Sequence, residues 1–334
     1  MKYGVMDHVD DSGRTPREHY EARLRFVETL DQSGFYSYHV AEHHGTPLGF
    51  APSPNIFLSA VAQRTRQLRF GPMVYVAGLY HPMRLAEEIC MLDQMSGGRL
   101  QVGMGRGAVG IEQDIYGVDP GTMARRYEEA RDIVLRALTS PQVNFAGEFF
   151  EVRDFPMVLQ SLQQPRPPLW YGLGHPEGAA WAASVAANVV SLRPAAATRP
   201  ALERYRQEWQ KLGRAEQDLP FMGVARHVVV AETDAQAQAA ARAAYPRWRA
   251  SLSAIWDARQ VPFPMPMPTQ WDELEGRGMA IAGSPQRVAA YVRAETEVAG
   301  GNFFLCHMMF GDMPLEFAQQ SARLFAFEVA PQLP

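Results

Sequence analysis

Short apolar runs alternate along this chain with longer amphipathic stretches. The apolar runs are rich in β-branched and aromatic residues, and their lengths are typical of buried strands. We place strands at residues 2–6, 35–41, 68–76, 100–104, 169–172, 189–192, 221–231 and 302–308. Between most of these runs, apolar residues recur every three or four positions, which predicts amphipathic helices. Strands that alternate with helices indicate a parallel sheet.

Local signals mark where several of the helices begin and end. Thr15-Pro16-Arg17-Glu18 combines a capping threonine, a proline at the first helical position and a glutamate that closes a capping box. Gly34 ends that helix. Further helices are predicted at residues 56–64, 81–97, 123–138 and 315–329.

Eight predicted strands are the number that closes a (β/α)8 barrel. A doubly wound open sheet is the alternative, but no Gly-x-Gly-x-x-Gly follows the first strand, which disfavours its dinucleotide-binding form. The later part of the chain is less regular, with a hairpin expected at 143–152, a Pro-rich linker at 164–168 and a Pro- and Met-rich stretch within 245–280. We expect one domain over residues 1–334, an α/β TIM barrel with an insertion before the last strand, in which 245–280 forms a lid.

Composition narrows the class of protein but not its chemistry. The hydrophobic fraction is 47% and the charged fraction is 20%, which suits a globular protein with a sizeable core. The net charge of -4 and the absence of a basic stripe argue against a nucleic-acid partner. No apolar run is long enough to cross a membrane, no signal-peptide pattern opens the chain, and two cysteines make no disulfide framework. We therefore expect a cytoplasmic protein.

In a barrel, the chemistry lies at the carboxyl ends of the strands, and Glu42-His43-His44 is the densest polar cluster at such an end. A metal site is one interpretation, but no third ligand of comparable clarity is present, so no metal is predicted. General acid–base chemistry by a histidine is the second interpretation. The third is that these histidines only form hydrogen bonds within the barrel mouth.

Two glycine-rich segments suggest a bound phosphate. Gly103-Met104-Gly105-Arg106-Gly107 ends the fourth strand, where small residues would let a flat ligand approach and an arginine can bind an anion. The turn after the fifth strand contains Gly174, His175 and Gly178 and leads into a helix, an arrangement that presents free N–H groups to an anion. A tight turn without a ligand explains each segment equally well by itself. Together they suggest a phosphorylated cofactor.

The segment between residues 41 and 107 also resembles a known family. Five groups of residues occur in the order and spacing of the bacterial luciferase-like flavin-dependent monooxygenases: Ala41-Glu42-His43-His44, Pro54, His81-Pro82-Met83-Arg84, residues 92–100 and Gly103 to Gly107. A weaker resemblance continues to the C-terminus. It implies a (β/α)8 barrel that binds FMN, reduced by a separate reductase, and uses O2 to oxygenate a small and largely apolar substrate resembling an aldehyde, a ketone or a sulfonate.

The resemblance also assigns roles to individual residues. His43 matches the histidine that acts as an acid–base group beside the flavin, which makes it the predicted catalytic residue. Predicted cofactor-binding residues are Met73, Val74, Gly105, Arg106, Glu112, Gly174, His175 and Gly178, of which Met73-Val74 lies where the family often has a non-prolyl cis peptide. Residues expected to line the substrate pocket are His44, Tyr75, His227 and His307.

The chain departs from the luciferase pattern at two points. Gly105 stands where luciferase has a reactive cysteine, and the phosphate turn lacks serine and threonine hydroxyls. Two alternatives therefore stay open, an F420-dependent dehydrogenase on the same barrel and a flavin-binding protein without turnover. A homodimer that packs through the helices after the second and third strands is also implied by the resemblance.

Overall fold

The computed structural model describes residues 1–107, 110–263 and 267–334. Its main sheet is parallel and consists of the strands β1 (Lys2–Asp7), β2 (Ser37–Val40), β3 (Arg69–Pro72), β4 (Tyr75–Val76), β5 (Val102–Gly105), β8 (Leu169–Gly172), β9 (Asn188–Ser191), β10 (Met222–Val230), β11 (Ala280–Gly283) and β12 (Phe303–His307). The eight predicted strands all coincide with members of this sheet. The prediction of a parallel sheet is confirmed.

The sheet closes into a barrel. Its order is β3-β2-β1-β12-β10-β9-β8-β5-β4, and β11 pairs with β10 beside this path. β3 and β4 are successive parts of the predicted third strand, and both lie against the fourth, through the bridge between Phe70 and Leu100 and the pairing of Tyr75 with Met104. The two ends of the path therefore meet, which confirms the (β/α)8 barrel.

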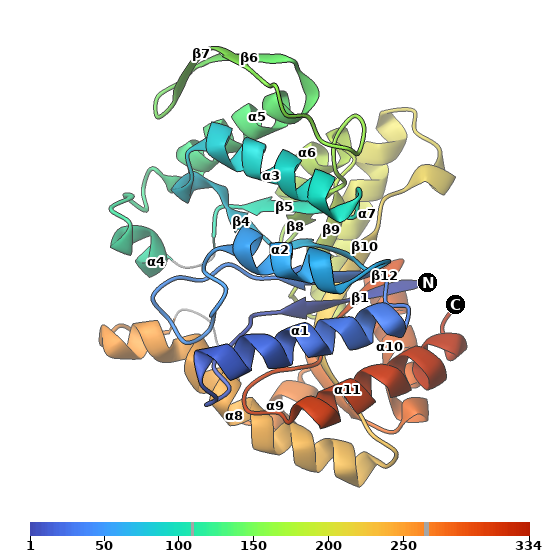
Figure 1. The fold of residues 1–334 in the computed structure, drawn as a ribbon. Coiled ribbons are helices and arrows are strands. Elements are labelled where there is room, and N and C mark those ends of the chain that lie inside the picture. The colour runs from blue at the N-terminus through green and yellow to red at the C-terminus, as the bar shows by residue number, and fades with distance from the viewer. Residues whose placement is uncertain (108–109, 264–266) are drawn as a thin grey trace.

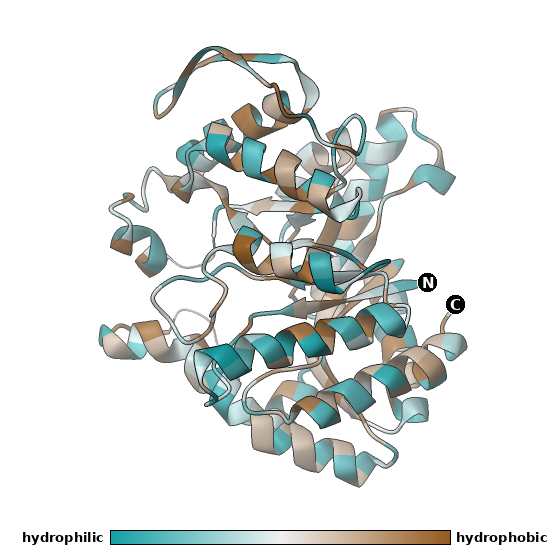
Figure 2. Ribbon diagram, viewed as in Figure 1, coloured by the Kyte–Doolittle hydropathy of each residue, from teal (hydrophilic) through white to brown (hydrophobic). Residues whose placement is uncertain are grey.

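Helices surround the barrel, as Figure 1 shows. The helices that follow barrel strands are α1 (Pro16–Gln32), α2 (Pro54–Arg64), α3 (Pro82–Ser96), α5 (Met123–Thr139), α6 (Ala179–Ser184), α7 (Ala195–Lys211), α10 (Pro285–Ala299) and α11 (Leu315–Leu324), the last continued by a π-helical turn over Phe325–Val329. Hydrophobic and hydrophilic residues alternate along these helices (Figure 2), and most of the residues that the helices bury are hydrophobic. The capping box predicted at Thr15 and Glu18 is present.

Three excursions interrupt the strand–helix rhythm. The antiparallel hairpin of β6 (Gln142–Ala146) and β7 (Glu151–Pro156) confirms the one expected near 143–152. The short helix α4 (Gly110–Ile115) was not predicted. Between β10 and α10 lie α8 (Asp234–Ala258), α9 (Trp271–Gly276) and β11, and Pro246 lies inside α8.

The insertion differs in detail from its prediction. The first part of the segment 245–280 is the second half of α8, and residues 264–266 lie outside the described residues. β11 was missed because Ala280-Ile281-Ala282-Gly283 is short and made mainly of small residues, which carry little strand signal. Its partner β10 is long enough to pair with β11 beyond the barrel proper.

Side chains of the barrel strands alternate between two environments. The inward-facing ones form an apolar cluster of Met6, Ala41, Met73, Trp170, Val190, Ala225, Phe303 and Leu305. Their neighbours in the sequence, such as Val5 and Phe304, pack in the larger core that includes the helices. Because direction alternates along a strand, residues 8, 43, 227 and 307 are expected to continue the inward face toward the carboxyl ends.

Within the described residues, no helix is both long and apolar enough to span a membrane.

Candidate active site

Four histidines form one layer at the carboxyl end of the barrel. His8, His43, His227 and His307 each follow a residue of the apolar cluster by two positions, on or just after β1, β2, β10 and β12. Ring centroids lie 5.6 Å apart for His8 and His43, 4.9 Å for His8 and His307, and 4.4 Å for His227 and His307. Strand alternation thus brings together residues that are up to 299 positions apart in the sequence.

His43 is oriented by a carboxylate. Its Nδ1 lies 2.9 Å from Oε1 of Glu112, which α4 presents, and the His43 side chain keeps 14% of its surface exposed while that of Glu112 keeps 6%. A carboxylate can only accept a hydrogen bond, so His43 donates to it from Nδ1–H. In its neutral form, His43 therefore carries its lone pair on Nε2. In the described part of the chain, that Nε2 has no hydrogen-bond partner. The pair therefore presents one basic nitrogen toward the barrel mouth.

Glu42 and His44 serve a different purpose from His43. Oε1 of Glu42 lies 2.8 Å from Nε2 of His44, and its Oε2 accepts from the Val76 N–H at 3.1 Å and from the Tyr80 hydroxyl at 2.8 Å. His44 Nδ1 in turn bonds the Tyr116 hydroxyl at 2.9 Å. Glu42 thus ties the end of β2 to β4, and both ring nitrogens of His44 are engaged within the protein.

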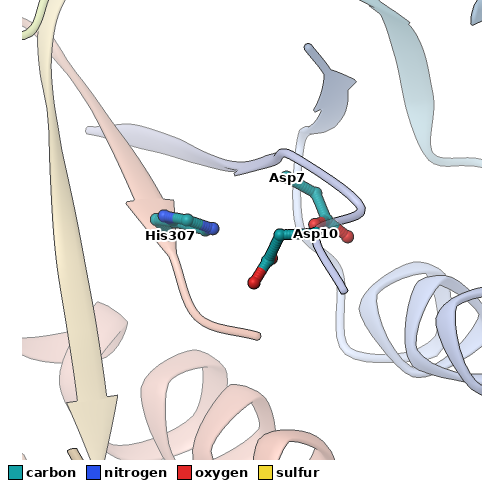
Figure 3. Close-up of side chains that lie close together, drawn as sticks. All are labelled: Asp7, Asp10 and His307. Carbon is teal, nitrogen blue, oxygen red and sulfur yellow. The ribbon is translucent and has the colours of Figure 1, made fainter. Parts of the chain in front are cut away.

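Two carboxylates, Asp7 and Asp10, lie beside His307 of the histidine layer, as Figure 3 shows. Ligand atoms of these three residues lie within 4.8 Å of one another, which is compatible with a metal site. However, the fully buried Arg23 donates to Asp7 at 2.9 Å and to Asp10 at 3.1 Å. The remaining carboxylate oxygens accept from the Tyr38 hydroxyl and the Gly311 N–H.

This cluster is therefore an internal ion pair with its own hydrogen bonds. Burial raises the pKa of Asp10 to about 7, although Arg23 opposes the shift. Because a guanidinium supplies the positive charge between the two carboxylates, a metal ion would have to displace it. The Arg23 guanidinium also donates to the Met309 carbonyl, so it couples α1 to the loop after β12.

Basic side chains gather on the other side of the barrel. Arg106 follows β5, is exposed and forms no ion pair in the described ranges. Arg193 follows β9 and donates to the Gly174 carbonyl at 2.9 Å and to His175 Nδ1 at 3.3 Å. The turn after β8 therefore has an arginine that the sequence interpretation missed, although its position directly after a strand was an available signal.

Packing within the barrel requires glycine at two positions of β5. A Cβ on Gly105 would approach Cγ2 of Val74 to 2.6 Å, and one on Gly103 would approach the Pro72 carbonyl oxygen to 2.4 Å. These glycines are thus needed where β5 packs against β3 and the residues that follow it. The peptide between Met73 and Val74 is cis, as the resemblance implied.

Tyr75, which was expected to line the substrate pocket, forms its polar contact with α2. It is fully buried, its hydroxyl donates to Asn55 on α2, and burial raises the pKa of its phenol. Tyr75 therefore packs between the strand and α2. His227 and His307, in contrast, lie in the histidine layer.

Gly178 packs under the ring of Tyr171, which a Cβ there would approach to 2.9 Å.

Sequence reasoning also assigned no role to His8 or Trp248. The Trp248 indole N–H donates to His8 Nδ1 at 3.4 Å, and its ring lies 4.4 Å from that of His227. Trp248 comes from α8, in the insertion, and nothing local in the sequence connects it with β1. Only the way in which α8 packs over the barrel brings these residues together.

Comparisons with known proteins agree with this geometry. The family model described as luciferase-like monooxygenase matches residues 1–302. An uncharacterised protein of Sinorhizobium fredii is 38% identical over 98% of this chain and 96% of its own length. The oxygenase component of the flavin-dependent trigonelline monooxygenase of Acinetobacter baylyi is 28% identical over 72% of this chain and 68% of its own.

A solved structure extends the comparison to the whole fold. It is the oxygenating constituent of 3,6-diketocamphane monooxygenase from Pseudomonas putida, a type II Baeyer–Villiger monooxygenase in complex with FMN. It superimposes with a TM-score of 0.82 at 20% identity and covers 100% of this chain and 99% of its own. The family model spans most of the chain, and the barrel and its closure match. This chain belongs to the family of luciferase-like monooxygenases.

Proposed function

We propose that this protein is an FMN-dependent monooxygenase that uses reduced flavin and O2 to oxygenate a small, largely apolar substrate. The observation that carries the proposal is the His43–Glu112 pair, which presents a basic nitrogen at the mouth of an apolar barrel. The relatives named as flavin-dependent or bound to FMN support the choice of cofactor.

The donor set on the basic side of the barrel fits a flavin phosphate. Arg106 and Arg193 would supply charge, and the N–H groups of Gly174 and His175 have no acceptor within the described residues. A Cβ added to Gly172 or Gly174 would meet nothing within 4 Å, so the turn is open on that side. Met73, Val74 and the apolar cluster below them suit the flat ring of the flavin.

The flavin and the protein's own side chains would then have separate roles in the reaction. The bound reduced flavin would supply the two electrons that activate O2. His43 Nε2 would take up or return a proton at the reacting atoms, while Glu112 fixes the ring and its tautomer. The apolar barrel would exclude water, which favours transfer of oxygen to the substrate over its loss as hydrogen peroxide.

The described residues of the segment 245–280 are proposed to cover the mouth. Ile255 and Trp256 at the end of α8 pack with Ile111 of α4 and with Phe263. Arg259 forms an ion pair with Asp114 at 3.0 Å. The segment after α8 therefore contacts the same helix that carries Glu112, so closure of this segment would also position the carboxylate behind His43.

The proposal includes two partners. A separate reductase would supply the reduced FMN, since the flavin-dependent relative is named as an oxygenase component. A second copy of the chain would pack through α2 and α3, where Ile56, Met91 and Met95 are exposed apolar residues. The two cysteines are free and buried, which fits the cytoplasm.

The cofactor assignment is tested by equilibrium dialysis of the protein against FMN, riboflavin and F420. We expect FMN to bind, and riboflavin to bind more weakly because it lacks the phosphate. Reduced FMN is then mixed with oxygenated buffer in the presence and absence of the protein. Reoxidation at the rate of free flavin, with all of the O2 recovered as hydrogen peroxide for every ketone and aldehyde offered, would contradict a monooxygenase.

A further inference from the structure

His8 occupies the centre of the histidine layer, although the proposed chemistry gives it no role. Its ring is stacked beside that of His43, with 27° between the ring planes and 5.6 Å between centroids. On its other side lies His307, at 4.9 Å, and Trp248 covers it from α8 at 5.8 Å. A polar ring in this position faces the same space as the nitrogen proposed to act in catalysis.

The hydrogen bonds around His8 decide which ring atom carries its proton. The Trp248 indole is only a donor, and it points at His8 Nδ1, so a neutral His8 has its proton on Nε2. In the described part of the chain, His8 Nε2 has no acceptor. His43 shows the opposite tautomer, in which Nδ1–H donates to Glu112 and Nε2 keeps its lone pair. The two stacked rings thus offer one donor and one acceptor.

The rings next to His8 hold it in place. His307 Nδ1 and His227 Nε2 share a hydrogen bond of 2.9 Å. The other nitrogen of His307, Nε2, is buried and has no partner among the residues that the structure describes. The ring edge of His307 faces the side of the barrel where Asp7 and Asp10 lie (Figure 3). His227 in turn packs edge-on against Trp248. His8 is therefore surrounded by rings that are themselves fixed.

The charges around His8 indicate whether a group that binds to it is neutral or charged. Burial, reinforced by His43, His227 and Arg23, holds the pKa of His8 well below its ordinary value, so the ring is neutral near pH 7. Nearby carboxylates belong to Asp7, Asp10 and Glu112. The two terminal nitrogens of Arg23 donate to Asp7, Asp10 and the Met309 carbonyl, while its buried Nε has no partner within the described residues. An anion here would meet carboxylates, and the Arg23 guanidinium already forms ion pairs with two of them, which is unfavourable for an anion at low dielectric.

We propose that His8 is a substrate-binding residue whose Nε2–H donates to a neutral oxygen of the substrate, a carbonyl or a hydroxyl, and so places it beside His43. The site would accordingly accept ketones, aldehydes or alcohols and reject sulfonates and carboxylates. This inference rests on the proposed function, and it narrows the substrate of that same site. Trp248 acts as a positioning residue, because it sets the tautomer that makes His8 a donor.

The first test uses the wild-type protein loaded with oxidised FMN, so that no turnover occurs. Its histidines are labelled with ¹⁵N, and cyclohexanone, cyclohexanol, cyclohexanesulfonate and methylcyclohexane are added in turn. We expect cyclohexanone and cyclohexanol to shift the Nε2 resonance of His8, and cyclohexanesulfonate to leave it unchanged. If the sulfonate shifts it as strongly, or if none of the four probes shifts it, the proposal is overturned.

The second test measures the affinity of cyclohexanone by calorimetry for His8→Phe, His8→Gln and Trp248→Phe. Loss of one neutral hydrogen bond predicts a Kd about threefold to tenfold higher for His8→Phe, with the affinity for methylcyclohexane unchanged. His8→Gln keeps a donor and should recover part of the loss. His81→Phe, on an exposed residue at the start of α3, is the matched control.

The two proposals fail in different ways. FMN binding is measured first for every variant, by quenching of flavin fluorescence. If the wild-type protein does not bind FMN, the proposed function is rejected. If FMN binds normally but His8→Phe leaves the Kd of cyclohexanone unchanged, only the assignment of His8 is rejected.

Discussion

The two sides of the barrel mouth differ in burial and in charge. On the side of β2, β1, β12 and β10, four histidines and a set of carboxylates lie close together and largely out of solvent. On the side of β5, β8 and β9, Arg106, His175 and Arg193 are exposed around an open turn. One side can hold neutral polar groups and move protons, and the other can hold a charged phosphate. The proposed function would thus use opposite sides of one ring of strands for its two tasks.

The difference in charge between the two sides follows from whether their charged groups are buried or exposed. The buried carboxylates Asp7 and Asp10 require a cation, and Arg23 supplies it from α1. The charge of Arg23 is therefore already shared between two carboxylates on that side. The arginines of the other side stay in solvent, where their charge costs little until a ligand arrives.

The largest expected effect is the loss of oxygenation on replacing His43. His43→Ala removes the proposed acid–base group, and general acid–base catalysis typically contributes about 10²–10⁴-fold. We expect product formation to fall by about that factor while FMN binding is retained, and His81→Ala to behave as wild type. Oxygenation at more than about half the wild-type rate would assign the chemistry to another residue.

The second prediction concerns the ion pair below the histidine side. Arg23→Met leaves two buried carboxylates without their cation, which costs about 3–5 kcal/mol in the free energy of unfolding. Urea titration measures this loss. The control is Arg84→Met, since Arg84 forms an exposed pair with Glu88 that is worth about 0–1 kcal/mol. Equal losses in the two variants would contradict the contrast between a buried and an exposed arginine.

A smaller effect is expected on the basic side. Arg106→Ala should raise the Kd of FMN by about tenfold, equivalent to about 1.4 kcal/mol, and leave the Kd of riboflavin unchanged. Arg125→Ala, which removes an exposed pair with Glu148 near the hairpin, is the control. If the affinities for FMN and riboflavin fall together, Arg106 acts on the ring or on folding and not on the phosphate.

The smallest effect is a change in the pH dependence of stability. Burial lowers the pKa of His227 to about 3, below that of an exposed histidine, so the unfolded chain binds one more proton between about pH 3 and 6.5. The free energy of unfolding should therefore fall as the pH is lowered through this window. His227→Phe should flatten the slope by up to about 1.4 kcal/mol per pH unit, measured by urea titration at pH 5 and 6. An unchanged slope would mean that His227 is not held neutral by burial.

The resemblance in the sequence came largely from residues that stabilise the barrel. In the motif over residues 92–100, Arg99 donates to Thr65 and to the carbonyls of Ala62 and Leu68 at 2.7–3.0 Å. Asp93 binds Gln163, which precedes the strand β8. These residues hold α2, α3 and the strands in place at a distance from the histidine layer. A family can therefore be identified from residues that stabilise its fold, although these residues carry no information about the substrate.

The sequence by itself determined the order of strands and helices, the closed barrel and the candidates at strand ends. Period-two and period-3.6 patterns, together with capping signals, are local, so His43 and Arg106 could be found from their neighbours. Only the tertiary structure decided that Glu112 faces His43, that Arg193 joins the turn at Gly174, and that Tyr75 packs toward α2. It also brought Trp248 to His8 across 240 residues. Such contacts depend on how helices and loops fold over the barrel, and no local pattern in the chain records that arrangement.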